Sequence, residues 1–171
     1  MRGAKPSGPF FVDTNVLVYA FSSQDPRKRE LSRTLLETDR ACISTQVLSE
    51  LANVLTKRFA VRAEEARRRI LEIAEGCDVM PVTPAIVADG LRIMESAGYS
   101  FFDSQIIAAA LAAGARTLYS EDLHTGQIID GTLQIMSPFA SLARQRPPGY
   151  AARPAMKKSG TKKSRGRTPA S

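Results

Sequence analysis

Short apolar runs alternate with longer stretches of helical periodicity along most of this chain, and no other feature constrains its fold as strongly. The short runs predict strands at 10–12, 41–43, 79–82, 117–119 and 133–136. The stretches between them predict helices at 14–21, 27–37, 45–59, 61–76, 84–97 and 103–113. Strands that alternate with helices form a parallel sheet that is covered on both faces. The sequence therefore predicts an α/β protein, a three-layer α/β/α domain with a central parallel sheet.

Proline and glycine residues refine the prediction of these elements. Pro81 lies in the third apolar run, and proline cannot donate a hydrogen bond to a neighbouring strand, so this strand is expected at the edge of the sheet. Gly98 and Gly114 follow two of the predicted helices, where glycine commonly ends a helix.

The charge of the chain is divided unevenly. The formal net charge is +7, but nine of the 24 Lys and Arg residues and none of the 17 Asp and Glu residues lie in 144–171. The remaining 15 bases against 17 acids leave a net charge of −2 on residues 1–143. Only Tyr150 and Met156 are large and apolar in the basic segment, so burial cannot offset the entropy of ordering it. We therefore expect a flexible N-terminus at 1–8, one domain at 9–143 and a disordered basic tail at 144–171.

Composition excludes several classes of function. A single histidine and two cysteines argue against most serine–histidine, cysteine–histidine and zinc chemistries. The longest apolar runs are far shorter than the roughly 20 residues that cross a bilayer, and no apolar segment follows the charged N-terminus, so we expect no secretory signal. The sequence thus predicts a cytoplasmic protein without a membrane partner, in which carboxylates carry any catalysis.

Four acidic residues lie just after predicted strands or near the starts of helices: Asp13, Glu50, Asp103 and Asp122. Ligands of parallel sheets gather beyond the carboxyl ends of the strands, so the fold could bring these acids together. Hard cations such as Mg²⁺ or Mn²⁺ prefer carboxylate and water oxygens. Such an ion offsets repulsion between the acids, lowers the pKa of a water and neutralises charge on a phosphate.

Each acid taken alone also has a simpler interpretation. Asp13 and Asp103 each lie at the start of a predicted helix and could be N-caps. Glu50 falls on the seam of an amphipathic helix, where it could be solvated or paired with Lys57 or Asn53. The fourth acid would most often be a turn residue. The hypothesis of a metal site therefore depends on their joint placement.

Four segments around these acids resemble the motifs of the PIN-domain nucleases and, more narrowly, the VapC toxins of bacterial toxin–antitoxin pairs. In chain order they read VDTNVL (12–17), ISTQVLSEL (43–51), FDSQIIAAAL (102–111) and LYSEDL (118–123). The match covers about residues 9–140. The resemblance implies a PIN-like fold and a Mg²⁺- or Mn²⁺-dependent endoribonuclease that cleaves RNA and inhibits translation.

The resemblance also implies roles for individual residues. The acids that would surround the metal are Asp13, Glu50, Asp103 and Asp122. Asp13 and Asp103 would be direct ligands, and the other two would bind directly or through water. The polar residues that would support the site are Thr14, Asn15 and Ser120. The partners implied for such a toxin are an RNA substrate, a cognate antitoxin protein and a second copy of the chain, whereas the residues that contact RNA stay unassigned.

One departure from the family pattern bears on the number of metal ions. Many relatives have a further acid a few residues after the position of Asp122, where this chain has His124, Thr125 and Gly126. Asp130 lies too far along the chain to replace it, so a one-metal mechanism stays open. Two alternatives also remain: a PIN nuclease of RNA maturation without an antitoxin, and a catalytically silent RNA-binding module that uses the basic tail.

Overall fold

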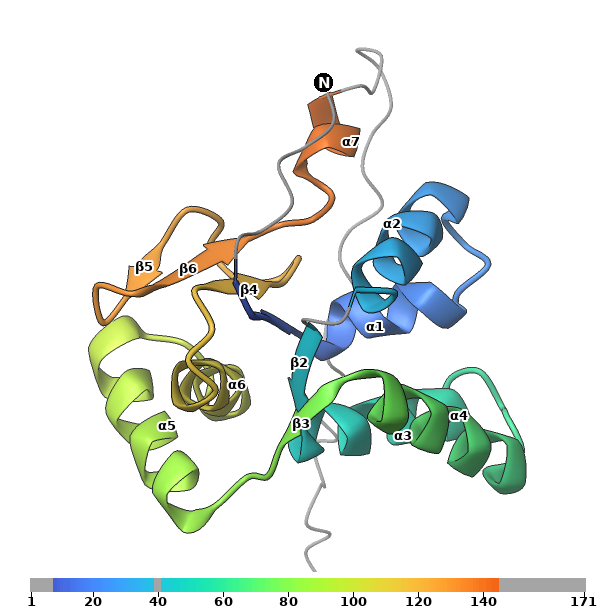
Figure 1. The fold of residues 1–171 in the computed structure, drawn as a ribbon, viewed down its shortest axis with the longest axis horizontal. Coiled ribbons are helices and arrows are strands. Elements are labelled where there is room, and N and C mark those ends of the chain that lie inside the picture. The colour runs from blue at the N-terminus through green and yellow to red at the C-terminus, as the bar shows by residue number, and fades with distance from the viewer. Residues whose placement is uncertain (1–7, 39–40, 145–171) are drawn as a thin grey trace, which may run out of the picture.

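A six-stranded sheet runs through the centre of the domain in the computed structural model, which describes residues 8–38 and 41–144 (Figure 1). The strands are β1 (Phe10–Val12), β2 (Ala41–Ser44), β3 (Asp78–Met80), β4 (Thr117–Tyr119), β5 (Ile128–Ile129) and β6 (Leu133–Met136). Their order across the sheet is β3-β2-β1-β4-β6-β5. All neighbouring pairs are parallel except β5 and β6, which are antiparallel. The predicted central parallel sheet is confirmed, with one antiparallel strand added at its edge.

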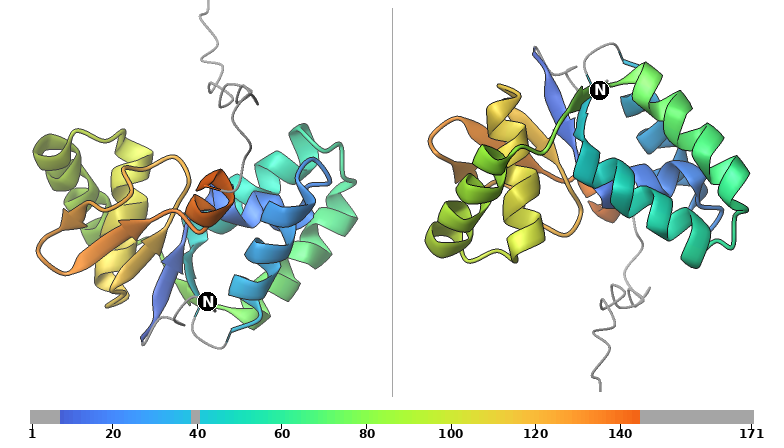
Figure 2. Two further views of the ribbon diagram at one scale, coloured as in Figure 1. Left: turned by 90° about the horizontal axis from the view of Figure 1, so that it is seen from above. Right: turned by 90° about the horizontal axis from the view of Figure 1, so that it is seen from below.

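Helices cover both faces of this sheet, as the views from above and below show (Figure 2). They are α1 (Thr14–Phe21), α2 (Pro26–Leu36), α3 (Thr45–Lys57), α4 (Ala63–Gly76), α5 (Pro84–Ala97), α6 (Phe101–Ala112) and α7 (Ala140–Arg144). Helices α1 to α4 lie on one side of the sheet, and α5 and α6 lie on the other. The three-layer arrangement agrees with the prediction from the sequence. Within the described residues, no helix is both long and apolar enough to cross a membrane.

Strand β1 occupies the middle of the sheet and is buried along its whole length. Phe10 lies opposite Ala41 of β2, and Phe11 lies opposite Leu118 of β4. A strand covered by helices on both faces is apolar at every position rather than at every second one, which explains the unbroken run of the sequence. Because β1 ends at Val12, the next residue emerges at the carboxyl edge of the sheet.

Helix α6 is buried on almost all sides, including every residue from 104 to 110. Its N-cap is Ser100, whose side chain accepts a hydrogen bond from the backbone N–H of Asp103 at 3.3 Å. The helix therefore begins at Phe101 rather than at Asp103, and the predicted start was wrong by two residues. Both Ser and Asp are good caps, so their spacing left the choice between them open.

Gly90 of α5 lies against the backbone of α6, and this close approach gives a first prediction. A Cβ at position 90 would lie 3.2 Å from Cα and 3.3 Å from the backbone N of Gln105. The buried backbone of α6 has little room to move, so Gly90→Ala should lower the free energy of unfolding by about 1–2 kcal/mol despite the better helix propensity of alanine. Urea unfolding measures the effect. Gly76→Ala is the control, because no atom lies within 4 Å of that Cβ, and equal stability of the two variants would contradict the prediction.

Some elements and boundaries differ from the prediction by a few residues or lie outside the described residues. Strand β5 and helix α7 were not predicted, and α7 crosses the expected end of the domain at residue 143. The predicted edge position of the third strand is confirmed, since β3 lies at the end of the sheet and stops before Pro81. Apart from Gly8 and Arg144, the predicted flexible N-terminus and basic tail lie outside the described residues.

Candidate active site

Asp13 follows β1 directly and is only 6% exposed. Its backbone N–H donates to the carbonyl of Tyr119 at 2.9 Å, which fixes it beside the end of β4. Asp13 stands at the N-cap position of α1, but its side chain makes no capping hydrogen bond. Instead, Oδ2 accepts hydrogen bonds from Asn15 Nδ2 and Ser120 Oγ, both at 2.7 Å. Helix capping therefore does not explain this carboxylate.

Ser120 connects the loop after β4 to Asp13. Its buried hydroxyl donates to Asp13 and accepts from Asn15 Nδ2 at 3.1 Å. The same oxygen accepts from the backbone N–H groups of Asp122 at 3.2 Å and Leu123 at 3.3 Å. Asn15 Nδ2 also lies 3.3 Å from Oδ2 of Asp122, which is exposed. Two supporting residues that the resemblance implied thus lie between the first and the fourth predicted acid.

Glu50 of α3 reaches the same edge of the sheet from the other side. Its Oε2 accepts from Thr14 Oγ1, and its Oε1 accepts from Gln46 Nε2, both at 2.9 Å. Gln46 Nε2 also donates to the carbonyl of Phe102 at 3.0 Å, one residue before Asp103. These bonds connect α3 with α1 and α6. Glu50 is half-buried and makes these contacts with Thr14 and Gln46, a different pairing from the solvated alternatives considered above.

Asp103 is half-buried in the first turn of α6, where Oδ2 accepts from Ser100 Oγ at 2.6 Å. Burial raises the pKa of Asp13 from 3.8 to about 7, the Ser120 hydrogen bond opposes this rise, and the charges of Glu50 and Asp103 add to it. The three carboxylates are therefore close enough to interact electrostatically. A buried acid beside other acids is expected to bind a proton and become neutral when no cation offsets the repulsion between them.

The donor set fits a hard divalent cation. Carboxylate oxygens are the ligands that Mg²⁺ and Mn²⁺ prefer, and Mg²⁺ usually keeps several waters while one or two carboxylates bind it. Within 8–38 and 41–144, no three Asp, Glu, His or Cys side chains gather closely enough to hold an ion together. Among these residues, the predicted acids therefore do not form a cluster of three or more direct ligands.

The loop after Asp122 supplies no further acid to the site. The backbone N–H of His124 donates to the hydroxyl of Tyr99 at 3.4 Å, and the two rings lie 5.5 Å apart. Asp130 instead accepts hydrogen bonds from Arg92 of α5 at 2.6 and 3.3 Å. Asp130 thus pairs with a residue of α5.

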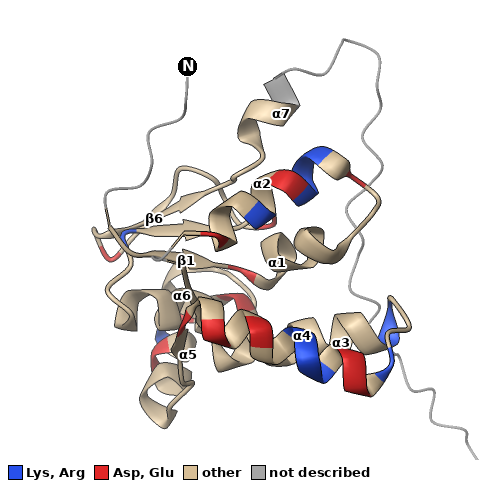
Figure 3. Ribbon diagram, turned by 45° about the vertical axis from the view of Figure 1, so that its right-hand side comes forward, with Lys and Arg blue, Asp and Glu red and all other residues tan. Residues whose placement is uncertain are grey.

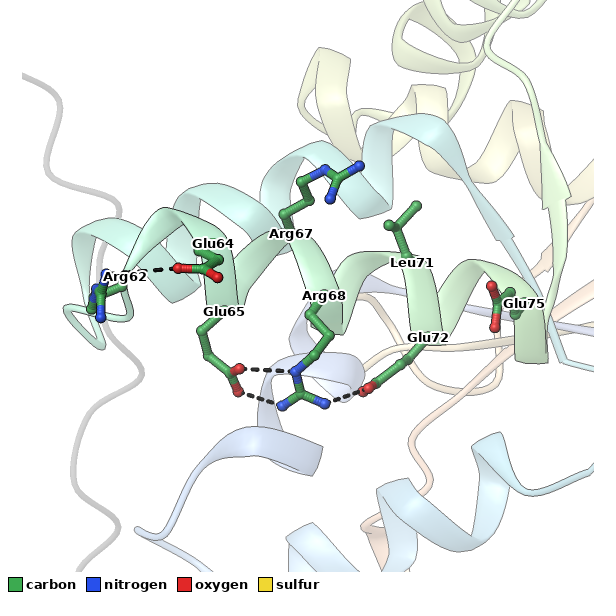
Figure 4. Close-up of a pocket in the computed structure, with 8 residues that line it drawn as sticks. All are labelled: Arg62, Glu64, Glu65, Arg67, Arg68, Leu71, Glu72 and Glu75. Carbon is green, nitrogen blue, oxygen red and sulfur yellow. Dashed lines mark hydrogen bonds and ion pairs between the residues drawn. The ribbon is translucent and has the colours of Figure 1, made fainter.

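Basic residues gather on α2 and α4, and those on α4 lie beside acids of the same helix (Figure 3). Arg68 forms ion pairs with Glu65 at 2.8 Å and with Glu72, and Arg69 pairs with Glu65 at 2.7 Å. The close-up in Figure 4 shows the Arg68 guanidinium between these two glutamates, along a shallow hollow of the surface. Two of the three consecutive arginines of α4 thus pair with glutamates of the same helix.

Sequence reasoning missed two groups near the acids. Gln46 lies one turn before Glu50, and this spacing on a helix face is the signal that could have placed it beside the acid. The contact between Lys28 of α2 and Glu121 had no such local signal, because the two residues are far apart in the chain.

Solved structures of bacterial proteins share this fold. The chain resembles DNA-bound VapBC from Salmonella typhimurium, with 22% identity, a TM-score of 0.58 and coverage of 77% of this chain and 98% of that one. A toxin–antitoxin complex from Klebsiella pneumoniae gives 18% identity, a TM-score of 0.57 and coverage of 77% and 98%. The sarcin-ricin loop cleaving toxin VapC20 of Mycobacterium tuberculosis is 20% identical, with a TM-score of 0.54 and coverage of 66% of this chain and 91% of that one. At these identities the similarity establishes the fold.

The sequence itself gives the assignment to a family. No curated protein is a significant sequence match to the chain. The profile of the PIN domain, however, matches residues 10–127, well over half of the 171 residues. This stretch contains all four predicted acids and the strands that position them. The chain therefore belongs to the PIN domain family.

Proposed function

We propose that this protein is a metal-dependent endoribonuclease and the toxin of a type II toxin–antitoxin pair. The observation that carries the proposal is the buried carboxylate of Asp13, held by Asn15 and Ser120 at the carboxyl edge of a PIN-domain sheet. Glu50 and Asp103 lie close enough to raise its pKa. A site with this much negative charge is suited to a divalent cation and, through it, to a phosphodiester.

In the proposed site, Asp13 and Asp103 hold Mg²⁺ or Mn²⁺, and Glu50 and Asp122 complete the site directly or through water. When bound, the ion supplies a water of lowered pKa and neutralises charge on the phosphate. The four acids come from four different segments of the chain, so the proposed site depends on the folded domain.

The neighbouring polar side chains orient these carboxylates. Asn15 and Ser120 fix Oδ2 of Asp13 through two hydrogen bonds, which limits the rotation of its carboxylate. Thr14 and Gln46 each bind one oxygen of Glu50 and set its direction in the same way. Residues that orient metal ligands commonly matter nearly as much as the ligands themselves.

The proposed partners are RNA, an antitoxin and a second copy of the chain, all in the cytoplasm. The antitoxin and the RNA substrate are supported by similarity to a toxin–antitoxin complex and to a toxin that cleaves the sarcin-ricin loop.

Cleavage of RNA by the purified protein tests the nuclease activity. Activity should require Mg²⁺ or Mn²⁺ and stop in excess EDTA, and Asp103→Asn should reduce it more than about a hundredfold because a direct ligand is lost. Asp130→Asn is the control, since this acid pairs with Arg92 outside the site. Cleavage in EDTA, or an Asp103→Asn enzyme with full activity, would refute the assignment.

Expression in bacterial cells tests the role as a toxin. The wild-type protein should arrest growth and translation, whereas Asp103→Asn should not. An active nuclease that leaves growth unaffected would instead identify an enzyme of RNA maturation, the first alternative considered above.

A further inference from the structure

Lys28 of α2 lies against the loop that carries Ser120 and Asp122. Its Nζ forms an ion pair with Glu121 and donates to the hydroxyl of Tyr19 at 3.1 Å. Only 16% of the lysine side chain is exposed, compared with 30% of Glu121. The Lys28 side chain is thus mostly buried.

Two aromatic rings surround the ammonium group of Lys28. Nζ lies 4.4 Å from the centroid of the Tyr19 ring and 4.9 Å from that of Phe139, and the two rings contact each other edge to face. Burial alone would lower the pKa of Lys28, but its bonds to Glu121 and Tyr19 raise it overall, so the group stays charged. We call Lys28, Glu121, Tyr19 and Phe139 the lysine clasp. It joins α1, α2, the loop after β4 and the turn before α7.

In the sequence, Glu121 of the lysine clasp lies between Ser120 and Asp122 of the acidic site. The backbone N–H of Glu121 donates to Oδ1 of Asn15 at 3.1 Å. The amide nitrogen of the same Asn15 side chain contacts Asp13, Ser120 and Asp122. The position of Glu121 therefore helps to set the orientation of the asparagine on which three site residues depend.

Helix α2 packs against the core through the partly buried side chains of Leu31, Leu35 and Leu36. Its one fully buried residue is Ser32, and its main neighbour in the fold is α1. Lys28 adds a contact with the loop after β4. A lysine suits this place, because its compact ammonium offers three donors and fits between two rings.

We propose that Lys28 is a positioning residue for the active site: it anchors Glu121 and thereby holds Asn15 and Asp122 in the orientation that the metal requires. This inference rests on the proposed function for its catalytic meaning, whereas the order that the clasp imposes on the loop exists without metal or RNA. Both parts can be measured separately.

Hydrogen exchange on the metal-free protein tests the structural part. Lys28→Met keeps most of the apolar stem and removes the charge, so the amides of Glu121, Asp122 and Leu123 should exchange at least about tenfold faster. The amides of β1 should not change. Lys57→Met is the matched control, because Lys57 is an exposed lysine at the end of α3. Unchanged exchange in the loop would overturn the proposal, whether or not the protein is a nuclease.

Metal titration and steady-state kinetics test the catalytic part. Lys28→Met should raise the Mg²⁺ concentration at the midpoint of the thermal shift by about 10–100-fold and lower kcat by about tenfold, with KM for RNA nearly unchanged. Lys28→Arg should restore part of the Mg²⁺ affinity and part of kcat. The wild type could bind Mg²⁺ and cleave RNA while a folded Lys28→Met variant gives the same Mg²⁺ midpoint. That result would overturn the positioning role of Lys28 and leave the proposed nuclease activity intact.

A second variant covers the case in which Lys28→Met does not fold. Glu121→Gln keeps the shape of the side chain and still accepts a hydrogen bond, but it removes the charge of the pair. It should shift the same Mg²⁺ midpoint in the same direction by at least about threefold. No shift in this variant would overturn the proposal.

Discussion

Replacement of Asp13 by asparagine is expected to make the metal-free protein more stable at about pH 8 while abolishing its response to Mg²⁺. The pKa of Asp13 is raised from 3.8 to about 7. Ionisation of this buried carboxylate therefore opposes folding by up to about 4 kcal/mol, since each pKa unit corresponds to about 1.4 kcal/mol. Asparagine removes the charge and can still accept hydrogen bonds from Asn15 and Ser120, so a gain of about 2–4 kcal/mol in the metal-free protein is expected.

The raised pKa of Asp13 also predicts how the free energy of unfolding changes with pH. Between pH 3.8 and about 7, the unfolded chain loses the Asp13 proton and the folded protein keeps it, so rising pH lowers this group's contribution to stability. Above about pH 7 the loss is complete and no longer changes. Urea unfolding of the metal-free wild type and Asp13→Asn across this range measures the difference.

A control variant and the effect of Mg²⁺ on the melting temperature test this prediction further. Glu64→Gln removes an acid whose side chain is 88% exposed, and it should leave the pH profile unchanged. Millimolar Mg²⁺ should raise the melting temperature of the wild type, because the ion binds only the folded site, and should not affect Asp13→Asn. An Asp13→Asn variant that is less stable than the wild type at about pH 8 without metal would contradict the prediction.

Two buried serines should respond differently to loss of the hydroxyl. Ser120 Oγ donates to Asp13 and accepts from one side-chain and two backbone donors, so Ser120→Ala leaves several groups without a partner. We expect a loss of about 2–3 kcal/mol in the free energy of unfolding and a fall in RNA cleavage of about 10–100-fold.

Ser104 is the matched comparison. It is as fully buried as Ser120, but among the described residues its hydroxyl has no hydrogen-bond partner. Ser104→Ala should therefore leave stability unchanged or raise it slightly, by less than about 1 kcal/mol, and leave cleavage unchanged. Urea unfolding and RNA cleavage of both variants check the pair, and similar losses in the two would show that burial rather than hydrogen bonding accounts for the effect.

The sheet and the places of the acids were predictable because each depends on a local signal. Phe10, Phe11 and Val12 form an apolar run, and the first acid comes directly after it. In a parallel sheet, the end of such a run identifies the functional edge without any knowledge of distant contacts. The two-residue strand β5 carries no periodicity of its own and is defined only by its pairing with β6.

The contacts that orient the acids were not predictable in the same way. Thr14 and Glu50 are 36 residues apart, and Lys28 and Glu121 are 93 apart. Such pairs follow from how α1, α2 and α3 pack on the sheet, which neither charge runs nor helical periodicity specifies. Ser100 and Asp103 show the same limit at short range, because each is an acceptable cap and only the packed helix decides between them.

The junction between β1 and α1 places three consecutive side chains on three different partners. Asp13 meets Ser120, Thr14 meets Glu50, and Asn15 reaches Asp122. One inserted residue here would rotate the start of the helix by about 100° and misdirect all three at once. The length of the junction between β1 and α1 is therefore fixed by these three contacts.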